Sequence, residues 1–196
     1  MKLEDYFSVS VRGYLFGDIR TLLSAQADAR GFGACNYPLT ATVCAGIEAF
    51  GALLKGDPLT KDRDEGRQNF LRFWERMHPG KPSIGTQIYR CVRNGLAHAF
   101  MTTGPFGLHR GSPSAHLVRE RGAGFISVEK FAETFIQEAD AVMQQGALHA
   151  QMQARLDEML HDFEVNAFGA LSGLPIGSGP IGGGASGLDA SLKPFT

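Results

Sequence analysis

The chain has 196 residues, of which 43% are hydrophobic, and a formal net charge of −1. A chain of this length is long enough to build one hydrophobic core of ordinary size with additional segments. The near-neutral charge excludes a basic surface spread over the whole molecule. Any contact with nucleic acid must therefore come from local clusters of basic residues.

Apolar residues at helical spacing predict helices over most of the first half of the chain. A first helix is expected over residues 14–29, before glycines interrupt the pattern. The sequence Asn36-Tyr37-Pro38 places a capping side chain shortly before a proline and predicts a second helix that continues to Gly56. A third, amphipathic helix is expected around residues 70–77, ending at Pro79-Gly80.

A fourth helix is predicted from about Ser83 to the sequence Gly104-Pro105. Between residues 104 and 128 the helical period fails, and two short strand-like runs flank a glycine-containing turn, which predicts a small β-hairpin insertion. Residues 129–144 are expected to be helical again, and the pattern continues beyond Gly146, which either kinks or splits this helix.

The last part of the chain, residues 168–196, is rich in glycine and serine and almost without charge. Such a segment buries too little apolar surface to offset the entropy of ordering it, which predicts a flexible tail. We therefore expect a mainly all-α fold, with a helical domain over residues 1–167 that carries the hairpin, followed by this tail.

The three cysteines are Cys35, Cys44 and Cys91. They form no C-x-x-C pair of the kind that binds zinc, and they have no paired base, so they are interpreted as reduced, buried thiols. The acidic start of the chain lacks the layout of a secretory signal, and no apolar run approaches the roughly 18 residues of a membrane span. We expect a cytoplasmic protein without a membrane partner.

The fourth helix has two different faces. Its apolar stripe runs through Ile84, Ile88, Val92 and Leu96, and the opposite arc carries Gln87, Arg90, Arg93, Asn94 and His98. Asn94 and His98 are four residues apart and are neighbours on a helix, whereas Arg93 and His98 are five apart and diverge by roughly 140°. If two copies of this helix faced each other across a two-fold axis, each Arg93 side chain would reach toward the partner copy's His98. The spacing therefore favours a homodimer for a catalytic site.

The string Y-R-C-V-R-N-G-L-A-H-A-F, residues 89–100, resembles the R-x4-6-H motif of the HEPN superfamily of helical-bundle proteins. A polar residue directly after the arginine, here Asn94, is a further feature of that family. The string Cys44-Ala45-Gly46-Ile47-Glu48 is similar to the second helix of related HEPN-like proteins. The resemblance covers roughly residues 14–101, while the hairpin and the glycine-rich tail are not general features of the family.

This resemblance implies metal-independent cleavage of RNA without a cofactor, by attack of a ribose 2′-hydroxyl on the adjacent phosphate. His98 would transfer protons, since imidazole does so near neutral pH, and the forked guanidinium of Arg93 would stabilise charge at phosphorus. Asn94 would orient the histidine or the phosphate. HEPN-like nucleases of this kind include toxins and host-defence or stress effectors, for which a protein inhibitor is an expected partner.

Local charge supports RNA as the partner. Residues 81–121 contain a single acidic residue, Glu120, and the predicted RNA-binding side chains are Arg90, Arg110, Arg119 and Arg121. Glu48 is interpreted as a solvated or helix-pairing carboxylate and is left outside the catalytic set. The histidines His98, His109 and His116 lack the regular spacing and acidic neighbours of a metal site.

Two other functions remain open on the same fold. One is a non-catalytic HEPN-like helical module that binds a protein partner through its exposed helix and tail. The other is a helical bundle that binds a small molecule or nucleotide without hydrolysing it. The three functions differ in whether His98 and Arg93 share a groove and in whether the protein cleaves RNA without added metal.

Overall fold

The computed structural model of the chain describes residues 1–26, 34–55, 64–110, 117–120 and 123–171. Residues 1–161 form one compact unit and residues 162–196 a second, and the architecture below is that of the first. The predicted fold class, mainly helical with a small β insertion, is confirmed. Within the described residues, no helix is both long enough and apolar enough to cross a bilayer.

The first helix begins well before the predicted position. It runs without a break through α1 (Leu3–Asp5), the π-helical η1 (Tyr6–Leu15) and α2 (Phe16–Ser24). A π turn closes its hydrogen bonds over five residues, so it places residues four or five apart on one face. The buried Leu3, Phe7 and Val11 lie four residues apart, a spacing that an α-helix and a π-helix share, so the predicted start at residue 14 is wrong.

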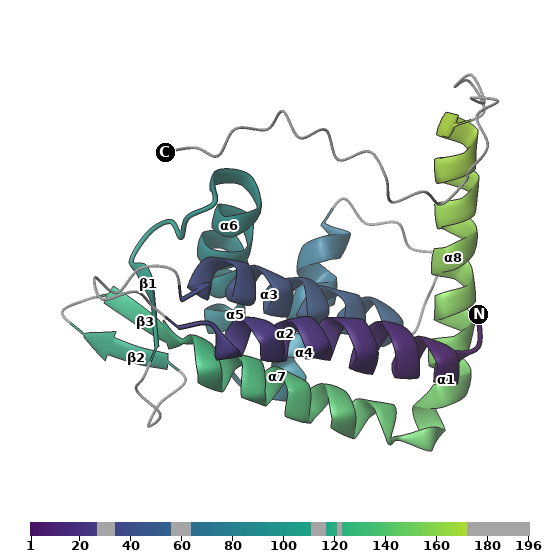
Figure 1. The fold of residues 1–196 in the computed structure, drawn as a ribbon, viewed down its shortest axis with the longest axis horizontal. Helices are drawn as coiled ribbons and strands as arrows, with labels where there is room; N and C mark the ends of the chain where they lie inside the picture. The colour runs from purple at the N-terminus through teal and green to yellow at the C-terminus, as the bar shows by residue number, and fades with distance from the viewer. Residues whose placement is uncertain (27–33, 56–63, 111–116, 121–122, 172–196) are drawn as a thin grey trace, which may run out of the picture. The chain divides into compact units, whose positions relative to one another are not determined.

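The central helix is α3 (Asn36–Leu53), and Figure 1 shows it crossing the middle of the unit. The predicted capping role of Asn36 is wrong. Cys35 is the N-cap, with a left-handed φ of 54° and no side-chain capping hydrogen bond. Asn36 lies inside the helix, and its Oδ1 accepts a hydrogen bond of 3.1 Å from Nε of Arg110.

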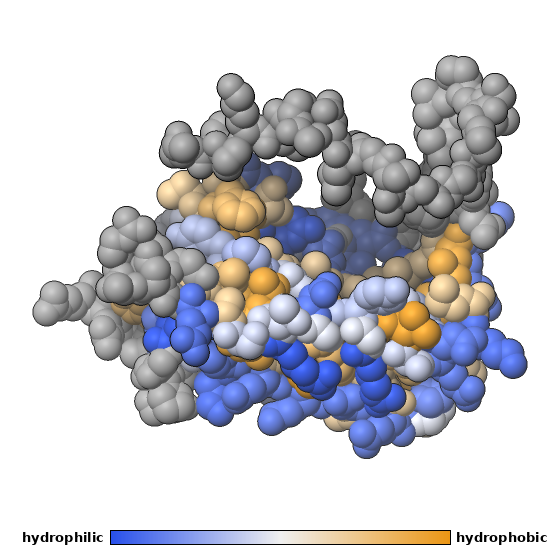
Figure 2. Space-filling view, viewed as in Figure 1, coloured by the Kyte–Doolittle hydropathy of each residue, from blue (hydrophilic) through white to orange (hydrophobic). Residues whose placement is uncertain are grey.

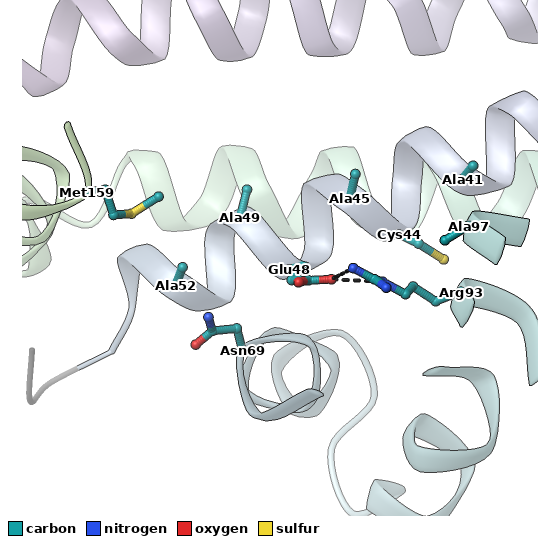
Figure 3. Close-up of a pocket in the computed structure, with 10 residues that line it drawn as sticks. All are labelled: Ala41, Cys44, Ala45, Glu48, Ala49, Ala52, Asn69, Arg93, Ala97 and Met159. Carbon is teal, nitrogen blue, oxygen red and sulfur yellow. Dashed lines mark hydrogen bonds and ion pairs between the residues drawn. The ribbon is translucent and has the colours of Figure 1, made fainter. Parts of the chain in front are cut away.

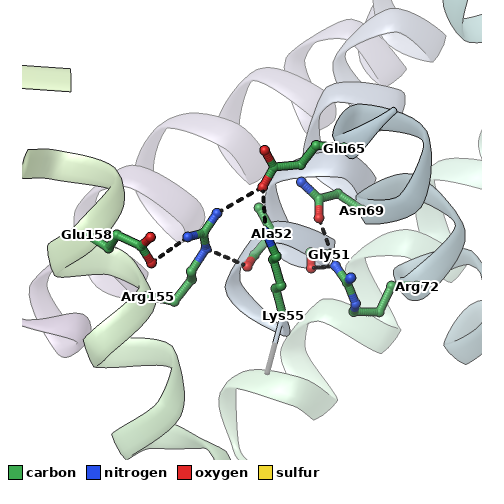
Figure 4. A network of polar contacts seen from close by, with 8 residues as sticks. All are labelled: Gly51, Ala52, Lys55, Glu65, Asn69, Arg72, Arg155 and Glu158. Atoms are coloured by element: carbon green, nitrogen blue, oxygen red, sulfur yellow. Dashed lines mark hydrogen bonds and ion pairs between the residues drawn. The ribbon is translucent and has the colours of Figure 1, made fainter. Parts of the chain in front are cut away.

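The C-terminal end of α3 is held by cationic side chains (Figure 4). Nη1 of Arg72 donates to the Gly51 carbonyl at 2.7 Å, and Nε of Arg155 donates to the Ala52 carbonyl at 3.3 Å. The last carbonyls of a helix carry partial negative charge and have no partner within the helix, so positive donors stabilise them. Glu65 balances this charge by pairing with Lys55 at 3.0 Å and with Arg155 at 3.2 Å.

Helix α4 (Glu65–Met77) contains the predicted third helix but begins earlier, at Glu65, and it packs against α3. The fourth helix is continuous through α5 (Pro82–Ile88), the π-helical η2 (Tyr89–Arg93) and α6 (Asn94–Ala99). Its predicted apolar stripe is confirmed, since Ile88, Val92 and Leu96 are buried and Ile84 is partly buried. The helix ends at Phe100, which has a left-handed φ of 53°.

The insertion is a sheet of three strands in the order β1-β3-β2. Strands β2 (Leu117–Glu120) and β3 (Ala123–Ser127) pair antiparallel, which confirms the predicted hairpin. Strand β1 (Phe106–His109) was not predicted and pairs parallel with β3, with Leu108 opposite Ile126. It has only four residues, one of them glycine, and its place in the sheet depends on this long-range pairing.

Two further helices follow the sheet. Ser127 caps α7 (Val128–Met143) by accepting a hydrogen bond from the Lys130 backbone, so Val128 is helical and does not continue the strand. Gly146 begins a single 3₁₀ turn, η3 (Gly146–Leu148). This turn separates α7 from α8 (His149–Leu171). Residues 168–171 of the predicted tail are helical, and the rest of the tail lies outside the described residues.

Aromatic rings from four helices fill the centre of the core. Phe135 of α7 contacts Phe16, Phe50 and Phe73 with ring centroids 6.1, 5.9 and 5.8 Å apart. The hydrophobic effect is roughly proportional to the apolar area removed from water, so these rings, all fully buried, contribute strongly to stability. They join α2, α3, α4 and α7 and thereby hold α3 in place under the site described below.

Gly51 marks the closest approach of α3 and α4. A Cβ at this position would lie 1.7 Å from the Asn69 carbonyl oxygen, so Gly51→Ala is expected to force the helices apart and lower the free energy of unfolding by about 3 kcal/mol. Gly17→Ala in α2 is the matched control, because nothing lies within 4 Å of its Cβ, and it should stabilise by about 0.5–1 kcal/mol. Urea unfolding measures both, and equal values would contradict the close packing.

Candidate functional site

A pocket of about 430 Å³ opens beside α3 (Figure 3). One face of α3 forms most of its wall, and one residue from α4, two from the fourth helix and one from α8 complete it. The lining residues are Ala41, Cys44, Ala45, Glu48, Ala49, Ala52, Asn69, Arg93, Ala97 and Met159. Because most of the α3 residues are alanines at helical spacing, the helix leaves open space where larger side chains would fill it.

Glu48 and Arg93 form an ion pair across this pocket. Nε of Arg93 donates a hydrogen bond of 2.9 Å to Oε2 of Glu48, and Nη2 lies 2.8 Å from the same oxygen in an ion pair. Nη1 of Arg93 donates to Oδ1 of Asn94 at 3.1 Å, and the guanidinium lies over the ring of Tyr89, 5.3 Å from its centroid. With three fixed contacts to its planar fork, Arg93 has one well-defined orientation.

Gly66 of α4 provides room for this arrangement. A Cβ on Gly66 would lie 2.7 Å from Oε1 of Glu48 and 3.1 Å from the Tyr89 hydroxyl oxygen. Both groups therefore reach over the backbone of α4 at a position without a side chain. Burial raises the pKa of Tyr89, an effect that the nearby Arg93 partly reverses, so the phenol is neutral and available as a donor at physiological pH.

Of the three predicted catalytic residues, the structure brings two together. Arg93 and Asn94 share a hydrogen bond and are half-buried. His98 is exposed and, within the described part of the chain, has neither a hydrogen bond nor an ion pair with them. This agrees with the divergence expected for residues five apart on one helix. Within a single copy, Arg93 and His98 are not a pair.

Glu48 is the residue that the sequence analysis missed. It is a helix-pairing carboxylate, one of the two interpretations given to it, but its partner is the central arginine of the motif. A signal was present in the sequence. Glu48 lies in a row of small residues at spacings of three and four, which include Ala41, Ala45 and Ala52, and a lone acid in such a row points toward a neighbouring element that carries its counter-ion.

The predicted RNA-binding arginines differ in their surroundings. Arg90 is exposed on the fourth helix. Arg110 donates to the carbonyls of Leu22, Leu23 and Ala25, and its side chain is only 19% exposed, so it binds the C-terminal end of α2. The side chain of Arg119 and the whole of Arg121 lie outside the described residues.

Cys44 lies at the base of the pocket beside the ion pair. Burial raises its pKa to about 12, against a smaller lowering by Arg93 and a small raising by Glu48. The thiol is therefore protonated at physiological pH, in agreement with the inert, buried cysteine expected from the sequence. Among the residues that the structure describes, no three or more His, Cys, Asp or Glu side chains form a group able to hold a metal ion.

No family model, curated protein or solved structure matches this chain. The resemblance of residues 89–100 to the HEPN motif thus remains a prediction from the sequence. The features of the chain that bear on its function are the pocket, the ion pair and the exposed residues of the fourth helix.

The raised pKa of Cys44 predicts selective protection from alkylation. At about pH 8.5 an ordinary thiol is half ionised, whereas Cys44, with its pKa at about 12, stays neutral in the native protein. Iodoacetamide should modify Cys44 far more slowly in native protein than in protein unfolded by urea, as measured by peptide mass mapping. Equal rates in the two states would contradict the burial of this thiol.

Proposed function

We propose that this protein is a metal-independent endoribonuclease of HEPN-like type that acts in the cytoplasm as a homodimer, in the manner of toxins and host-defence effectors. The observation that carries the proposal is the fixed orientation of Arg93 at a pocket of about 430 Å³, held by Glu48, Asn94 and Tyr89. An arginine held in this way suits a site that must meet a phosphate in one defined geometry.

Arg93 retains donors for such a phosphate. A guanidinium has five N–H groups, and the contacts to Glu48 and Asn94 use one on Nε, one on Nη2 and one on Nη1. One N–H therefore remains on each terminal nitrogen. Two parallel N–H groups match two oxygens of a phosphate and would strengthen as negative charge develops on them during the reaction.

In the proposed reaction, the ribose 2′-oxygen forms a bond to the adjacent phosphorus and the bond from phosphorus to the 5′-oxygen breaks. The products are a cyclic phosphate and a free 5′-hydroxyl. An imidazole is suited to accept the 2′-hydroxyl proton and, in its protonated form, to donate one to the leaving oxygen. The exposed His98 supplies this group, and the partner copy's His98 is the one expected to meet Arg93.

An exposed apolar surface beside α6 supports association. Phe100 is 68% exposed, Met101 53% and Tyr37 38%, and the rings of Tyr37 and Phe100 contact each other at 6.4 Å. In Figure 2, hydrophobic surface gathers over α6, in contrast to the hydrophilic α7 side of the same view. Exposed apolar patches of this kind mark contact surfaces, and this one adjoins the helix that carries His98.

The same surface favours one alternative function, a non-catalytic helical module that binds a protein partner. Phe100 has a φ of 53°, a conformation that is strained for a bulky residue and readily adopted by glycine. An exposed aromatic residue kept at such a position points to a binding role for its ring. This alternative needs the patch and requires nothing of Arg93 or His98, so the two functions make different predictions.

RNA cleavage in EDTA tests the nuclease. Arg93→Ala and His98→Ala are each expected to lower the cleavage rate of a mixed-sequence RNA by roughly 10²–10⁴-fold, because each removes a group that acts in the transition state. Arg12→Ala is the control, since Arg12 is an exposed arginine that pairs with Asp140 elsewhere in the fold. Intact RNA with the wild-type protein, at matched oligomeric state, would favour the binding module.

Phe100→Gly tests the apolar surface. Removal of a central aromatic residue from an interface typically costs about 2 kcal/mol, so dimer dissociation should become roughly 30-fold easier in sedimentation experiments. The free energy of unfolding of the monomer should be unchanged or higher, because glycine relieves the left-handed φ. Tyr14→Ala removes another exposed aromatic ring, 69% exposed, and should leave association unchanged. If both variants behave alike, the surface is not an interface.

A further inference from the structure

We propose that the pocket is a nucleobase-binding site in which Glu48 and Asn69 bind the hydrogen-bonding edge of an amino-bearing base. The inference deepens the proposed nuclease by assigning its base specificity, and to that extent it rests on the proposed function. The binding itself is independent of cleavage and can be tested without it.

Asn69 provides a hydrogen-bond donor to the pocket. The residue is only 6% exposed and lines the pocket from α4. Nη1 of Arg72 donates to its Oδ1 at 2.7 Å, and because arginine can only donate, this contact fixes which end of the amide is oxygen. Nδ2 must then lie on the other side, toward the pocket (Figure 3), where it has no hydrogen bond with any described residue.

Nδ2 donates to no described residue, and it is not one of the fully buried polar atoms that lack a partner, so it reaches the open space of the pocket, where a ligand can accept from it. Asn69 is therefore a polar side chain aimed at a site that a ligand can complete. Its position is also well fixed, since the same Nη1 of Arg72 donates to the Gly51 carbonyl at 2.7 Å (Figure 4). The donor is thus held by both α3 and α4.

Glu48 provides the matching acceptor. Both contacts with Arg93, the hydrogen bond from Nε and the ion pair with Nη2, use Oε2. Oε1 accepts no hydrogen bond from the described residues, and the side chain is 23% exposed. The pocket thus presents one donor and one acceptor from neighbouring helices. Asparagine and glutamate are among the side chains that bind base edges, and glutamate accepts from exocyclic amino groups.

The apolar walls fit a flat ring. The volume of about 430 Å³ lies within the range of small-ligand pockets, roughly 300–1,000 Å³. The alanines of α3 give a smooth wall, and Met159 supplies a thioether, which contacts aromatic rings favourably. With a base between them, the phosphate of the same nucleotide would meet the remaining donors of Arg93.

The polar groups also select among bases. Adenine, cytosine and guanine each carry an amino group next to an acceptor, so the amino group can donate to Glu48 while the acceptor meets Nδ2 of Asn69. Uracil also has a donor, N3–H, next to an acceptor, but when N3–H donates to Glu48 its second carbonyl oxygen lies beside the Glu48 carboxylate. Like charges or lone pairs placed together in this way disfavour the wrong ligand.

Calorimetric titration with AMP, CMP, GMP and UMP in EDTA tests this assignment. At least one amino-bearing nucleotide should bind saturably to the wild-type protein, with UMP at least 10-fold weaker. Asn69→Asp keeps the oxygen that Arg72 contacts and replaces the donor by an acceptor, so it should weaken that binding at least 10-fold. Gln68→Glu introduces a carboxylate at the exposed neighbouring residue and should not.

Glu48→Gln supplies the readout that a purely structural role would not change. Its amide oxygen can still accept from Arg93, while its NH₂ replaces the acceptor, so the preference should shift toward UMP. No saturable binding of any of the four nucleotides to folded wild-type protein would overturn the pocket, as would an unchanged preference in both variants. Selective binding with intact RNA would support the pocket and reject the nuclease, and RNA cleavage without nucleotide binding would do the reverse.

Discussion

The ion pair between Glu48 and Arg93 is the contact on which the site depends. Both side chains are about three-quarters removed from solvent, with exposures of 23% and 28%. A charge that is largely removed from solvent is strongly unfavourable unless an opposite charge lies beside it. Each of the two side chains therefore stabilises the buried position of the other. The pair also joins α3 to the fourth helix, and through Arg93 it orients Asn94 and contacts Tyr89. The same ion pair therefore stabilises the packing of the two helices and orients the side chain proposed to act in the site.

The π turn η2 determines where this contact can form. The fourth helix buries Ile88, Val92 and Leu96, which are spaced at intervals of four. In a regular helix such a stripe drifts slowly around the axis, and a wider turn corrects that drift and changes the direction of the residues next to it. Arg93 is the last residue of this turn. The irregularity lies at the motif itself, as is common for π turns at functional sites.

Much of the fold follows from local patterns in the sequence, because amphipathic spacing reports directly on which face of a helix is buried. The central helices α3 and α4, the apolar stripe of the fourth helix, α7 and the hairpin of β2 with β3 were predicted in this way. The early start of the first helix was missed although its buried Leu3, Phe7 and Val11 lie four residues apart, as they would on one face of an ordinary α-helix. Strand β1 was missed because only its pairing with β3 makes it a strand.

The candidate site could be predicted only in part, because the sequence shows spacing within one helix but not contacts between helices. Arg93, Asn94 and His98 share one helix, so their spacing is visible in the sequence. Glu48 and Asn69 come from two other helices, and their roles depend on the α3–α4 approach at Gly51 and on the donor Arg72. Tertiary contacts of this kind leave little trace in residue spacing.

Arg93 has two roles, as the proposed phosphate-binding group and as the counter-ion of Glu48, and this limits what its substitution can show. A substitution that removes its guanidinium also leaves the Glu48 carboxylate half-buried without a counter-ion, so a loss of activity would mix chemistry with local unfolding. His98 and Asn69 do not have this difficulty, because the first is exposed and the second keeps its Arg72 contact when its nitrogen becomes oxygen. The proposed chemistry at a phosphate and the proposed recognition of a base can therefore be tested separately at these two residues, with the Glu48–Arg93 pair left intact.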